Sequence, residues 1–413
     1  MVQQRKILIL MSKTGGGHIS LAEALRDRLQ SDYTIHTEDL LPRLIPRSYQ
    51  FIVQKARWLW SLAFHLSDTP RLALLGHRAM GPLIAPRLIA LLQQFQPDLV
   101  LSVHPLLTHA VTRVLDQHTP PIPFAMLFCD PMSTHAMWYT ERKAAATFAP
   151  TQEMYAQALA RGFDPSRLHY VGWPVRSQFT SVLKLPREQA IEELNRSQQW
   201  DLDPHRLTIF AASGGEGATH IERTARLVLA LSQDVQVIMA AGTNRALYRR
   251  CQGVKHLYAF PFTSEVARFM AVAHVTMGRC SPNILFESLA LGKPLIATSY
   301  MPGQEEDNLR FIEKHGLGWL APGSARLRAM VSTLLADFSS DRSMLNTMAE
   351  TVQAYQRMNA EANEAIVPSI HALLKATMIP DRMKNGGSET LPAAKADLYT
   401  TMAFGRTPLT DEK

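Results

Sequence analysis

Two glycine-rich stretches and one polar segment contain the residue types that could do chemistry. The first stretch, Gly15-Gly16-Gly17-His18, follows a short apolar run, and its glycines let a ligand approach the backbone closely. Free amides at the start of a helix favour an anion. A histidine beside them titrates near neutral pH, so His18 is a candidate general base. The alternative is a tight strand-to-helix turn in which the histidine has no chemical role.

The second stretch, Ser213-Gly214-Gly215-Glu216-Gly217, also lies between an apolar run and a helical pattern. Its successive amides would form a nest suited to a diphosphate. A tight turn is again the alternative for this stretch on its own. Two such loops facing each other are more informative, because one could hold a leaving diphosphate while the other presents a base.

The polar segment runs from Pro302 to Asn308. Gln304, Glu305 and Asn308 offer the hydrogen-bond donors and acceptors that a polyol such as a sugar requires. Glu287 precedes them in an apolar helical stretch, where a carboxylate needs a partner, and ribose hydroxyls would serve. An acidic helix start, and a solvent-facing Glu287, are the alternatives.

Acidic and histidine pairs elsewhere do not indicate a metal site. Asp201-Leu202-Asp203 resembles the acid pair of some sugar transferases but lies in a polar linker, so we interpret it as a solvated loop. His104, His109 and His135 lack the spacing of known zinc motifs. We therefore expect neither a metal nor a cofactor.

The elements that must position these residues repeat in order. Strand, glycine loop and helix occur at Ile7 to Leu29 and again at Leu207 to Leu231. Further buried-strand candidates are 99–103, 123–129, 235–240, 274–277 and 294–297, and they alternate with amphipathic helices. This pattern predicts an α/β fold with two Rossmann-like parallel-sheet domains, 1–175 and 176–378, facing across a cleft. Residues 379–413 lose periodicity and are expected to be disordered.

The basic excess, a net charge of +7, is concentrated between Leu41 and Phe95, where seven Lys and Arg residues accompany one acid, Asp68. The same stretch contains the aromatic residues Trp58, Trp60 and Phe64, a combination that favours an anionic surface. No recognised nucleic-acid motif accompanies it, so lipid headgroups are the better interpretation. No apolar run is long enough to span a bilayer, and three widely spaced cysteines fit a reducing compartment. We expect a cytoplasmic protein peripheral to the membrane.

Taken in order, these motifs resemble those of the monogalactosyldiacylglycerol synthases and their diacylglycerol glucosyltransferase relatives. The matching segments are Gly15 to His18, Val103 to His109, Asp130 to His135 with Trp138, Val171 to Arg176, Gly214 to Gly217, Gly292 to Leu295 and Gly303 to Asn308. The sequence departs from the family pattern at Gly278 to Asn283, where relatives carry a glycine-rich turn. Ser281 and Pro282 still predict a helix start there.

The resemblance implies a GT-B fold and an inverting transfer of galactose or glucose from a UDP-sugar to diacylglycerol at an anionic membrane surface. It implies that His18 is the base, with Gly16 and Gly17 beside it, and that Glu287 holds the ribose and Phe262 lies near the uracil. The remaining substrate-binding residues it implies are Gln304, Glu305 and Asn308 at the hexose and Arg176, Gly214, Gly215 and Glu216 at the diphosphate.

Other functions stay open on the sequence alone. These are N-acetylglucosaminyl transfer to a polyprenyl-linked acceptor, epimerisation of a UDP-sugar, and a catalytically silent binding module. The sequence does not separate galactose from glucose as the sugar.

Overall fold

The computed structural model describes residues 4–13, 16–42, 57–182, 185–212 and 219–376. Residues 1–374 form one compact unit, and residues 375–413 form the second. The predicted disordered tail and the second glycine loop, with Gly214, Gly215 and Glu216, lie outside the described residues. The predicted domain boundary near residue 175 stays a prediction.

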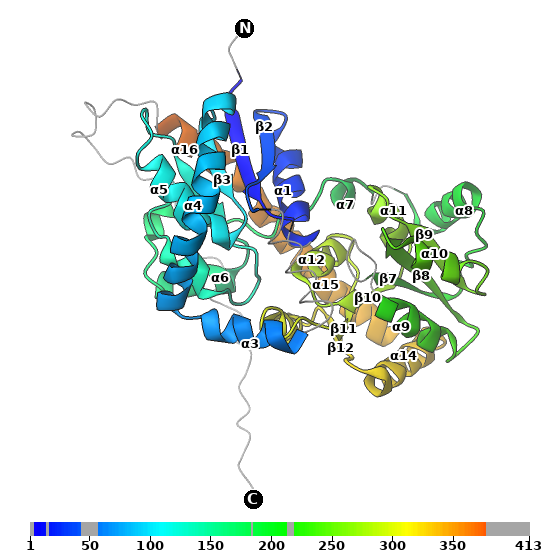
Figure 1. Cartoon of the computed structure of the whole chain (residues 1–413). Coiled ribbons are helices and arrows are strands. Elements are labelled where there is room, and N and C mark those ends of the chain that lie inside the picture. Colours follow the sequence, from blue (N-terminus) through cyan, green and yellow to red (C-terminus); the bar gives the residue numbers. More distant parts are fainter. Residues whose placement is uncertain (1–3, 14–15, 43–56, 183–184, 213–218, 377–413) are drawn as a thin grey trace, which may run out of the picture. The chain divides into compact units, whose positions relative to one another are not determined.

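The first half of the compact unit is built on a six-stranded sheet with the order β2-β1-β3-β4-β5-β6, in which every pair is parallel (Figure 1). Its elements are β1 (Lys6–Met11), α1 (Gly16–Leu29), β2 (Thr34–Asp39), α3 (Arg57–Ser67), α4 (Pro70–Phe95), β3 (Leu99–Ser102), α5 (Pro105–Leu115), β4 (Phe124–Leu127), η1 (Ala136–Thr140), β5 (Ala146–Ala149), α6 (Gln152–Ala160), η2 (Pro165–Arg167) and β6 (Leu168–Tyr170).

Both faces of this sheet are buried, as its continuous apolar strands predict. In β1, Ile7 and Ile9 pack in the same core as the apolar residues of α1. Leu8 and Leu10 point the other way, into a core shared with α4 and α5. Alternate side chains of one strand therefore join the sheet to helices on its two sides.

The second half is a six-stranded parallel sheet with the order β12-β11-β10-β7-β8-β9. Its strands are β7 (Leu207–Ala212), β8 (Val235–Gly242), β9 (Leu257–Pro261), β10 (Val275–Arg279), β11 (Leu295–Ser299) and β12 (Gly318–Leu320). The helices are α7 (Gln178–Ser181), α8 (Arg187–Gln198), α9 (Thr219–Leu229), α10 (Arg245–Cys251), α11 (Val266–Ala271), α12 (Pro282–Ala290), α13 (Glu306–His315), α14 (Ser324–Phe338), α15 (Ser343–Asn363) and α16 (Ile366–Ala376).

The segment that joins the two sheets is anchored by an aromatic pair and by the side-chain amide of Asn359. The rings of Trp173 and Phe286 stack with centroids 4.6 Å apart and planes within 7° of parallel. Asn359, on α15, accepts a hydrogen bond from the Trp173 amide and donates one to its carbonyl. These bonds fix the chain just before Arg176, which the sequence placed at the substrate.

Each sheet reverses its strand order at one place, and the loops that leave the strands there define a ligand crevice in doubly wound folds. In the first sheet the reversal lies between β1 and β3, so the loop before α1 and the chain after Ser102 meet. In the second it lies between β7 and β10, where the second glycine loop begins and the turn at Cys280 follows. The two predicted glycine loops therefore start at the two reversal points.

Among the described helices, none combines the length and apolarity needed to cross a bilayer.

Candidate functional site

The first site residue, His18, lies in the first turn of α1 at the reversal point of the first sheet. Its Nδ1 is 2.8 Å from the carbonyl oxygen of Val103, which follows β3. A carbonyl can only accept, so Nδ1 carries the proton and donates it. The neutral ring then presents an unprotonated Nε2, which is the form that a general base requires.

The environment of His18 keeps the imidazole neutral. Burial lowers its pKa to about 4, although the Val103 carbonyl and the charge of Asp39 act in the opposite direction. The side chain is nevertheless only partly buried by its accessible surface. The neutral ring therefore remains accessible to a substrate that could give it a proton.

A second imidazole, that of His104, packs against the imidazole of His18. Its ring centroid is 4.3 Å from that of His18, with the planes tilted by 53°. His104 is buried, and burial together with the neighbouring His18 lowers its pKa well below the usual value. Its Nδ1 accepts a hydrogen bond from the Leu106 amide and so caps α5. The sequence reasoning assigned no role to His104, although a histidine directly between a buried strand and a helix was visible.

The glycines before His18 lie next to the second half of the chain. Both Gly16 and Gly17 are exposed at the start of α1. A Cβ on Gly17 would lie 3.2 Å from Nδ2 of Asn283, whereas one on Gly16 would meet nothing within 4 Å. Gly17 therefore allows close approach to the first turn of α12.

The departure from the family pattern, Gly278 to Asn283, forms the end of β10 and the start of α12. Gly278 is required by packing, because a Cβ there would lie 2.0 Å from the carbonyl oxygen of Ala212 at the end of β7. The helix starts at Pro282 as predicted, but the Ser281 side chain makes no capping bond. Its turn is held instead by Asn308, whose Nδ2 donates to the Cys280 carbonyl over 2.9 Å.

Arg176 and Glu287, predicted at the diphosphate and the ribose, bind each other. Nε and Nη2 of Arg176 lie 3.0 and 2.7 Å from Oε1 of Glu287. Burial raises the pKa of Glu287, and Arg176 counters that rise. Arg176 also lies 3.6 Å from Glu23 on α1. The buried carboxylate thus has a partner, as the sequence required, but the partner is an arginine of the chain.

The polar segment before α13 is held in place partly by its own side chains. Glu305 is buried, with Oε2 accepting from the Met301 amide at 2.8 Å and Oε1 lying 3.4 Å from Nε of Arg279. Gln304 is partly buried beside it. Glu305 and Asn308 therefore position the turn after β10 as well as the segment itself. Phe262, just after β9, is 65% exposed and available for stacking.

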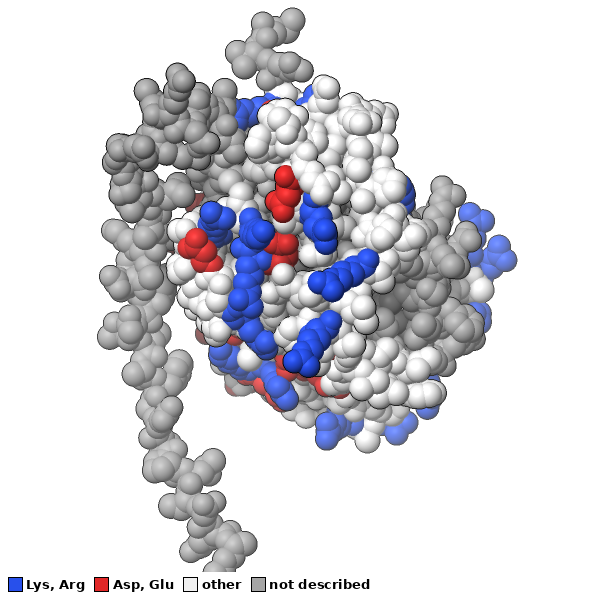
Figure 2. Space-filling view, turned by 60° about the vertical axis from the view of Figure 1, so that its left-hand side comes forward, with Lys and Arg blue, Asp and Glu red and all other residues white. Residues whose placement is uncertain are grey.

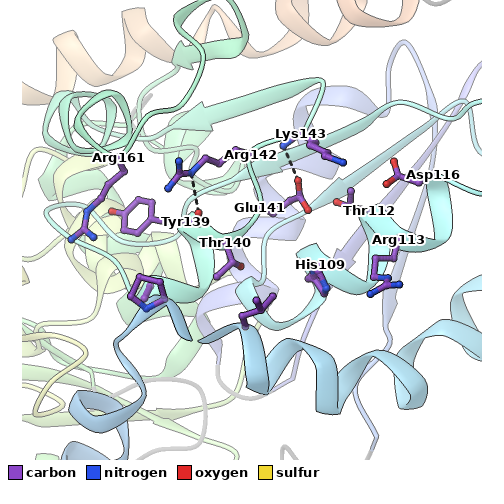
Figure 3. Close-up of a pocket in the computed structure, with 13 residues that line it drawn as sticks. His109, Thr112, Arg113, Asp116, Tyr139, Thr140, Glu141, Arg142, Lys143 and Arg161 are labelled. Carbon is purple, nitrogen blue, oxygen red and sulfur yellow. Dashed lines mark hydrogen bonds between the residues drawn. The ribbon is translucent and has the colours of Figure 1, made fainter. Parts of the chain in front are cut away.

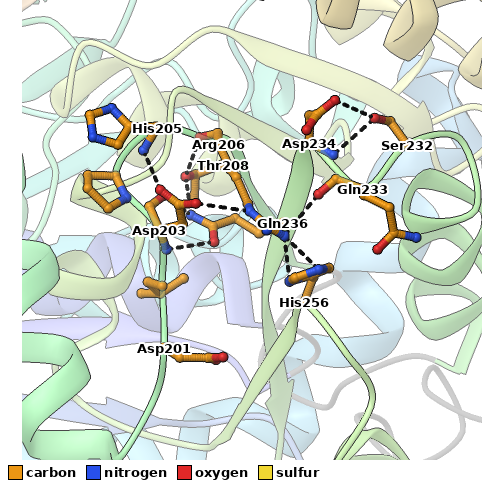
Figure 4. Close-up of polar contacts among 12 residues, drawn as sticks. Asp201, Asp203, His205, Arg206, Thr208, Ser232, Gln233, Asp234, Gln236 and His256 are labelled. Atoms are coloured by element: carbon orange, nitrogen blue, oxygen red, sulfur yellow. Dashed lines mark hydrogen bonds and ion pairs between the residues drawn. The ribbon is translucent and has the colours of Figure 1, made fainter.

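Asp203 belongs to a network of polar contacts at the amino ends of β7 and β8, and Asp201 lies near it (Figure 4). Oδ1 of Asp203 accepts from the His205 amide and Oδ2 lies 3.1 Å from Nε of Arg206. Asp201 accepts a hydrogen bond from the hydroxyl of Tyr258 at 2.8 Å. Parallel sheets bind ligands at the other ends of their strands. Within the described residues no group of three or more His, Cys, Asp or Glu side chains is arranged to hold a metal ion.

Two protein families match separate parts of the chain. The family described as "Monogalactosyldiacylglycerol (MGDG) synthase" matches residues 18–175, and the "Glycosyltransferase family 28 C-terminal domain" matches residues 208–364.

Two curated relatives from plants and one solved structure are similar over most of the chain. The probable monogalactosyldiacylglycerol synthase 2 of Oryza sativa subsp. japonica is 28% identical over 76% of this chain and 70% of its own length. Monogalactosyldiacylglycerol synthase 3 of Arabidopsis thaliana is 28% identical over 89% of this chain and 81% of its own. The calicheamicin glycosyltransferase CalG4 shares the fold with a TM-score of 0.59 at 16% identity, over 92% of this chain and all of its own. The chain has a GT-B fold and is a glycosyltransferase, with a match to the monogalactosyldiacylglycerol synthase family in its first half and to the family 28 C-terminal domain in its second.

Proposed function

We propose that the protein transfers a hexose from a UDP-sugar to the free hydroxyl of diacylglycerol, with inversion at the anomeric carbon. The observation that carries this proposal is the hydrogen bond from His18 to the Val103 carbonyl, which leaves Nε2 unprotonated on a ring that is only partly buried. The names of the relatives make galactose the first sugar to test.

The chemistry is a single displacement. Nε2 of His18 accepts the proton of the acceptor hydroxyl while that oxygen forms a bond to the anomeric carbon. The bond from the anomeric carbon to the diphosphate oxygen breaks on the opposite face, and UDP leaves. One displacement inverts the configuration, and positioning the two substrates supplies a large share of the rate. The amides of Gly214 and Gly215 and the guanidinium of Arg176 would stabilise the charge on the leaving group.

The reversal point of the second sheet would hold the donor. Glu287 is buried beside Arg176, so either the ribose hydroxyls join this pair or the diphosphate draws Arg176 away from it. Either change would couple the binding of UDP to the position of the segment after Trp173. Phe262 offers an exposed ring for the uracil, and Gln304, Glu305 and Asn308 lie on the segment that would face the hexose.

The acceptor would arrive from a membrane against which α3 and α4 lie. On α3, Trp58, Leu62 and Leu66 are 71, 49 and 62% exposed. The sequence predicted that Phe64 would also face the lipid. Its ring instead faces inward and packs edge-on against the ring of His135, with centroids 4.8 Å apart. Leu75 and Leu83 extend the exposed apolar surface along α4. A row of exposed apolar side chains without partners is typical of a lipid-binding face.

Positive charge accompanies this apolar surface, as binding to anionic lipid requires. Figure 2 shows Lys and Arg side chains gathered on one face of the molecule. The exposed cations of α4 and of the neighbouring elements are Arg71, Arg78, Arg87, Arg113, Arg142, Lys143 and Arg161. Four of them, Arg113, Arg142, Lys143 and Arg161, line a pocket of about 560 Å³ that Figure 3 shows beside His109 and Tyr139. The proposal therefore places the protein on the cytoplasmic face of a membrane, as a peripheral enzyme.

An acceptor panel tests this proposal. Purified protein receives labelled UDP-galactose or UDP-glucose with diacylglycerol vesicles, with a polyprenyl-linked sugar, or with no acceptor. Labelled lipid from diacylglycerol alone is the expected result. Label on the polyprenyl acceptor, or an epimerised nucleotide sugar without any acceptor, would assign the site to one of those reactions. Binding of UDP without any turnover would indicate a silent binding module.

A further inference from the structure

A carboxylate that the proposed mechanism does not use, Asp130, lies at the carboxyl edge of the first sheet. It follows β4 by three residues, and β4 pairs with β3, which leads to Val103. Oδ2 of Asp130 accepts the hydroxyl of Thr134 at 2.6 Å and contacts Sγ of Cys129 at 3.7 Å. No residue that the structure describes hydrogen-bonds Oδ1. One oxygen of this carboxylate is therefore anchored, and the other is available.

The segment that holds Asp130 touches the polar segment before α13. The hydroxyl of Ser133 donates to Oδ2 of Asp307. A Cβ on Gly303 would lie 3.0 Å from Cδ1 of Phe64, whose ring in turn packs against His135. Segments from the two sheets thus meet around the residues 130–135 and 303–307.

The charge of Glu305 acts on Asp130 across the place where these segments meet. Burial raises the pKa of Asp130 to about 6, the bonds from Thr134 and Cys129 oppose the rise, and the charge of Glu305 adds to it. Asp130 keeps some accessible surface, like His18. Two desolvated carboxylates repel each other unless donors lie between them.

Two neighbouring carboxylates favour a ligand with hydroxyl groups over an anionic ligand. An anion such as a diphosphate would be repelled, whereas the several hydroxyls of a hexose each donate to a carboxylate oxygen. The carboxylate whose charge raises the pKa of His18 is that of Asp39.

We propose that Asp130 binds the hexose of the donor through Oδ1, opposite Glu305, so that the sugar is held between a carboxylate of each sheet. This inference deepens the proposed function and rests on it. It adds a donor-binding residue from the first half of the chain to a site otherwise built from the second half.

The test compares the affinities for UDP and for UDP-hexoses by titration calorimetry, without any acceptor. We expect D130A and D130N to bind UDP within about twofold of the wild type. Their dissociation constants for UDP-galactose or UDP-glucose should rise by at least about tenfold, because a hydrogen bond to a charged group is lost. A matched control is D164N, since Asp164 also accepts a hydroxyl, from Ser166 at 2.7 Å, but on an exposed loop. That variant should behave as wild type.

A second variant distinguishes direct contact of Asp130 with the sugar from an indirect effect of Asp130 on the fold of the site. T134V removes the anchor of Oδ2 and leaves the carboxylate in place, so we expect a smaller loss of UDP-hexose affinity than in D130A. Unchanged affinity for both UDP-hexoses in D130A would overturn the inference. Equal losses for UDP and UDP-hexose would also overturn it, because they would mean that Asp130 acts through the fold of the site.

The role of Asp130 in donor binding can be tested separately from the identity of the acceptor. The wild-type protein could bind UDP-hexose more tightly than D130A does and still glycosylate no diacylglycerol. That result would support the role of Asp130 and rule out the proposed acceptor. Wild-type protein that binds UDP but no UDP-hexose would overturn both.

Discussion

Nδ1 of His18 donates a hydrogen bond to the carbonyl oxygen of Val103 across 2.8 Å, from the first turn of α1 to the end of β3. The bond exists because β1 and β3 are neighbours at the reversal of strand order, although their residues are far apart in the sequence. It fixes both the ring orientation and the tautomer, so the basic nitrogen faces away from the sheet.

Replacing His18 by alanine should lower the turnover number by about 100- to 10,000-fold, the usual contribution of a general base. UDP affinity should stay within about twofold, because the proposed contacts to the UDP part of the donor lie in the second half of the chain. Steady-state kinetics and calorimetry measure the two quantities. His118, which contacts the Pro120 carbonyl away from the site, provides the control variant H118A. Turnover that survives in H18A would remove His18 from the mechanism.

The imidazole of His18 should stay neutral well below neutral pH. Burial lowers its pKa to about 4, so the protonated form appears only as the pH falls toward that value. A nitrogen NMR titration, with the His18 signals assigned by their loss in H18A, should show no change between pH 8 and roughly 5.5. A midpoint near the usual value of 6.5 would mean that the ring is solvated and that the site is open rather than a narrow cleft.

Gly303 should be sensitive to substitution for two separable reasons. Its φ of +83° strains any residue with a Cβ, and that Cβ would also press on Phe64. Gly323 has a φ of +85° but nothing within 4 Å, so G323A reports the backbone strain alone, about 1 to 2 kcal/mol. We expect urea unfolding to show a larger loss for G303A than for G323A, together with weaker UDP-hexose binding. Equal losses would show that α3 does not press on this segment.

Charge introduced on the exposed face of α3 should weaken binding to lipid. We expect L62E to reduce co-flotation with anionic vesicles by roughly tenfold or more, because it removes apolar contact and adds a like charge. Leu159 on α6, 37% exposed, gives the matched control L159E. Retained flotation of L62E, or an equal loss in L159E, would argue against α3 as the contact surface. Binding should also fall as salt rises.

Strands with continuous apolar runs, such as Ile7 to Met11 and Leu207 to Ala212, were predictable because both faces of a parallel sheet are buried. β2 was not, because its edge position leaves Thr34 to Asp39 partly exposed and polar. The position of His18 in a helix that follows a strand was predictable from the order of the motifs.

Contacts between distant segments could not be read from local patterns. Glu287 was known to need a partner, but Arg176 lies 111 residues away and becomes its neighbour only when the helix α12 packs beside the linker. Asp130 lay in a segment that matched the family but was assigned no role, because its contacts with distant residues do not show in the sequence. Its relation to Glu305 arises only from the meeting of the two halves.

The most direct test is the linkage of the lipid product. Wild-type protein is incubated with UDP-galactose labelled in the sugar and with vesicles of diacylglycerol and anionic lipid, and the lipid fraction is analysed by NMR. Because the anomeric carbon of the donor is α, one displacement predicts a β-linked glycosyldiacylglycerol that is absent with H18A. An α-linked product, or label that never enters the lipid with UDP-galactose or UDP-glucose while UDP still binds, would contradict the proposed reaction.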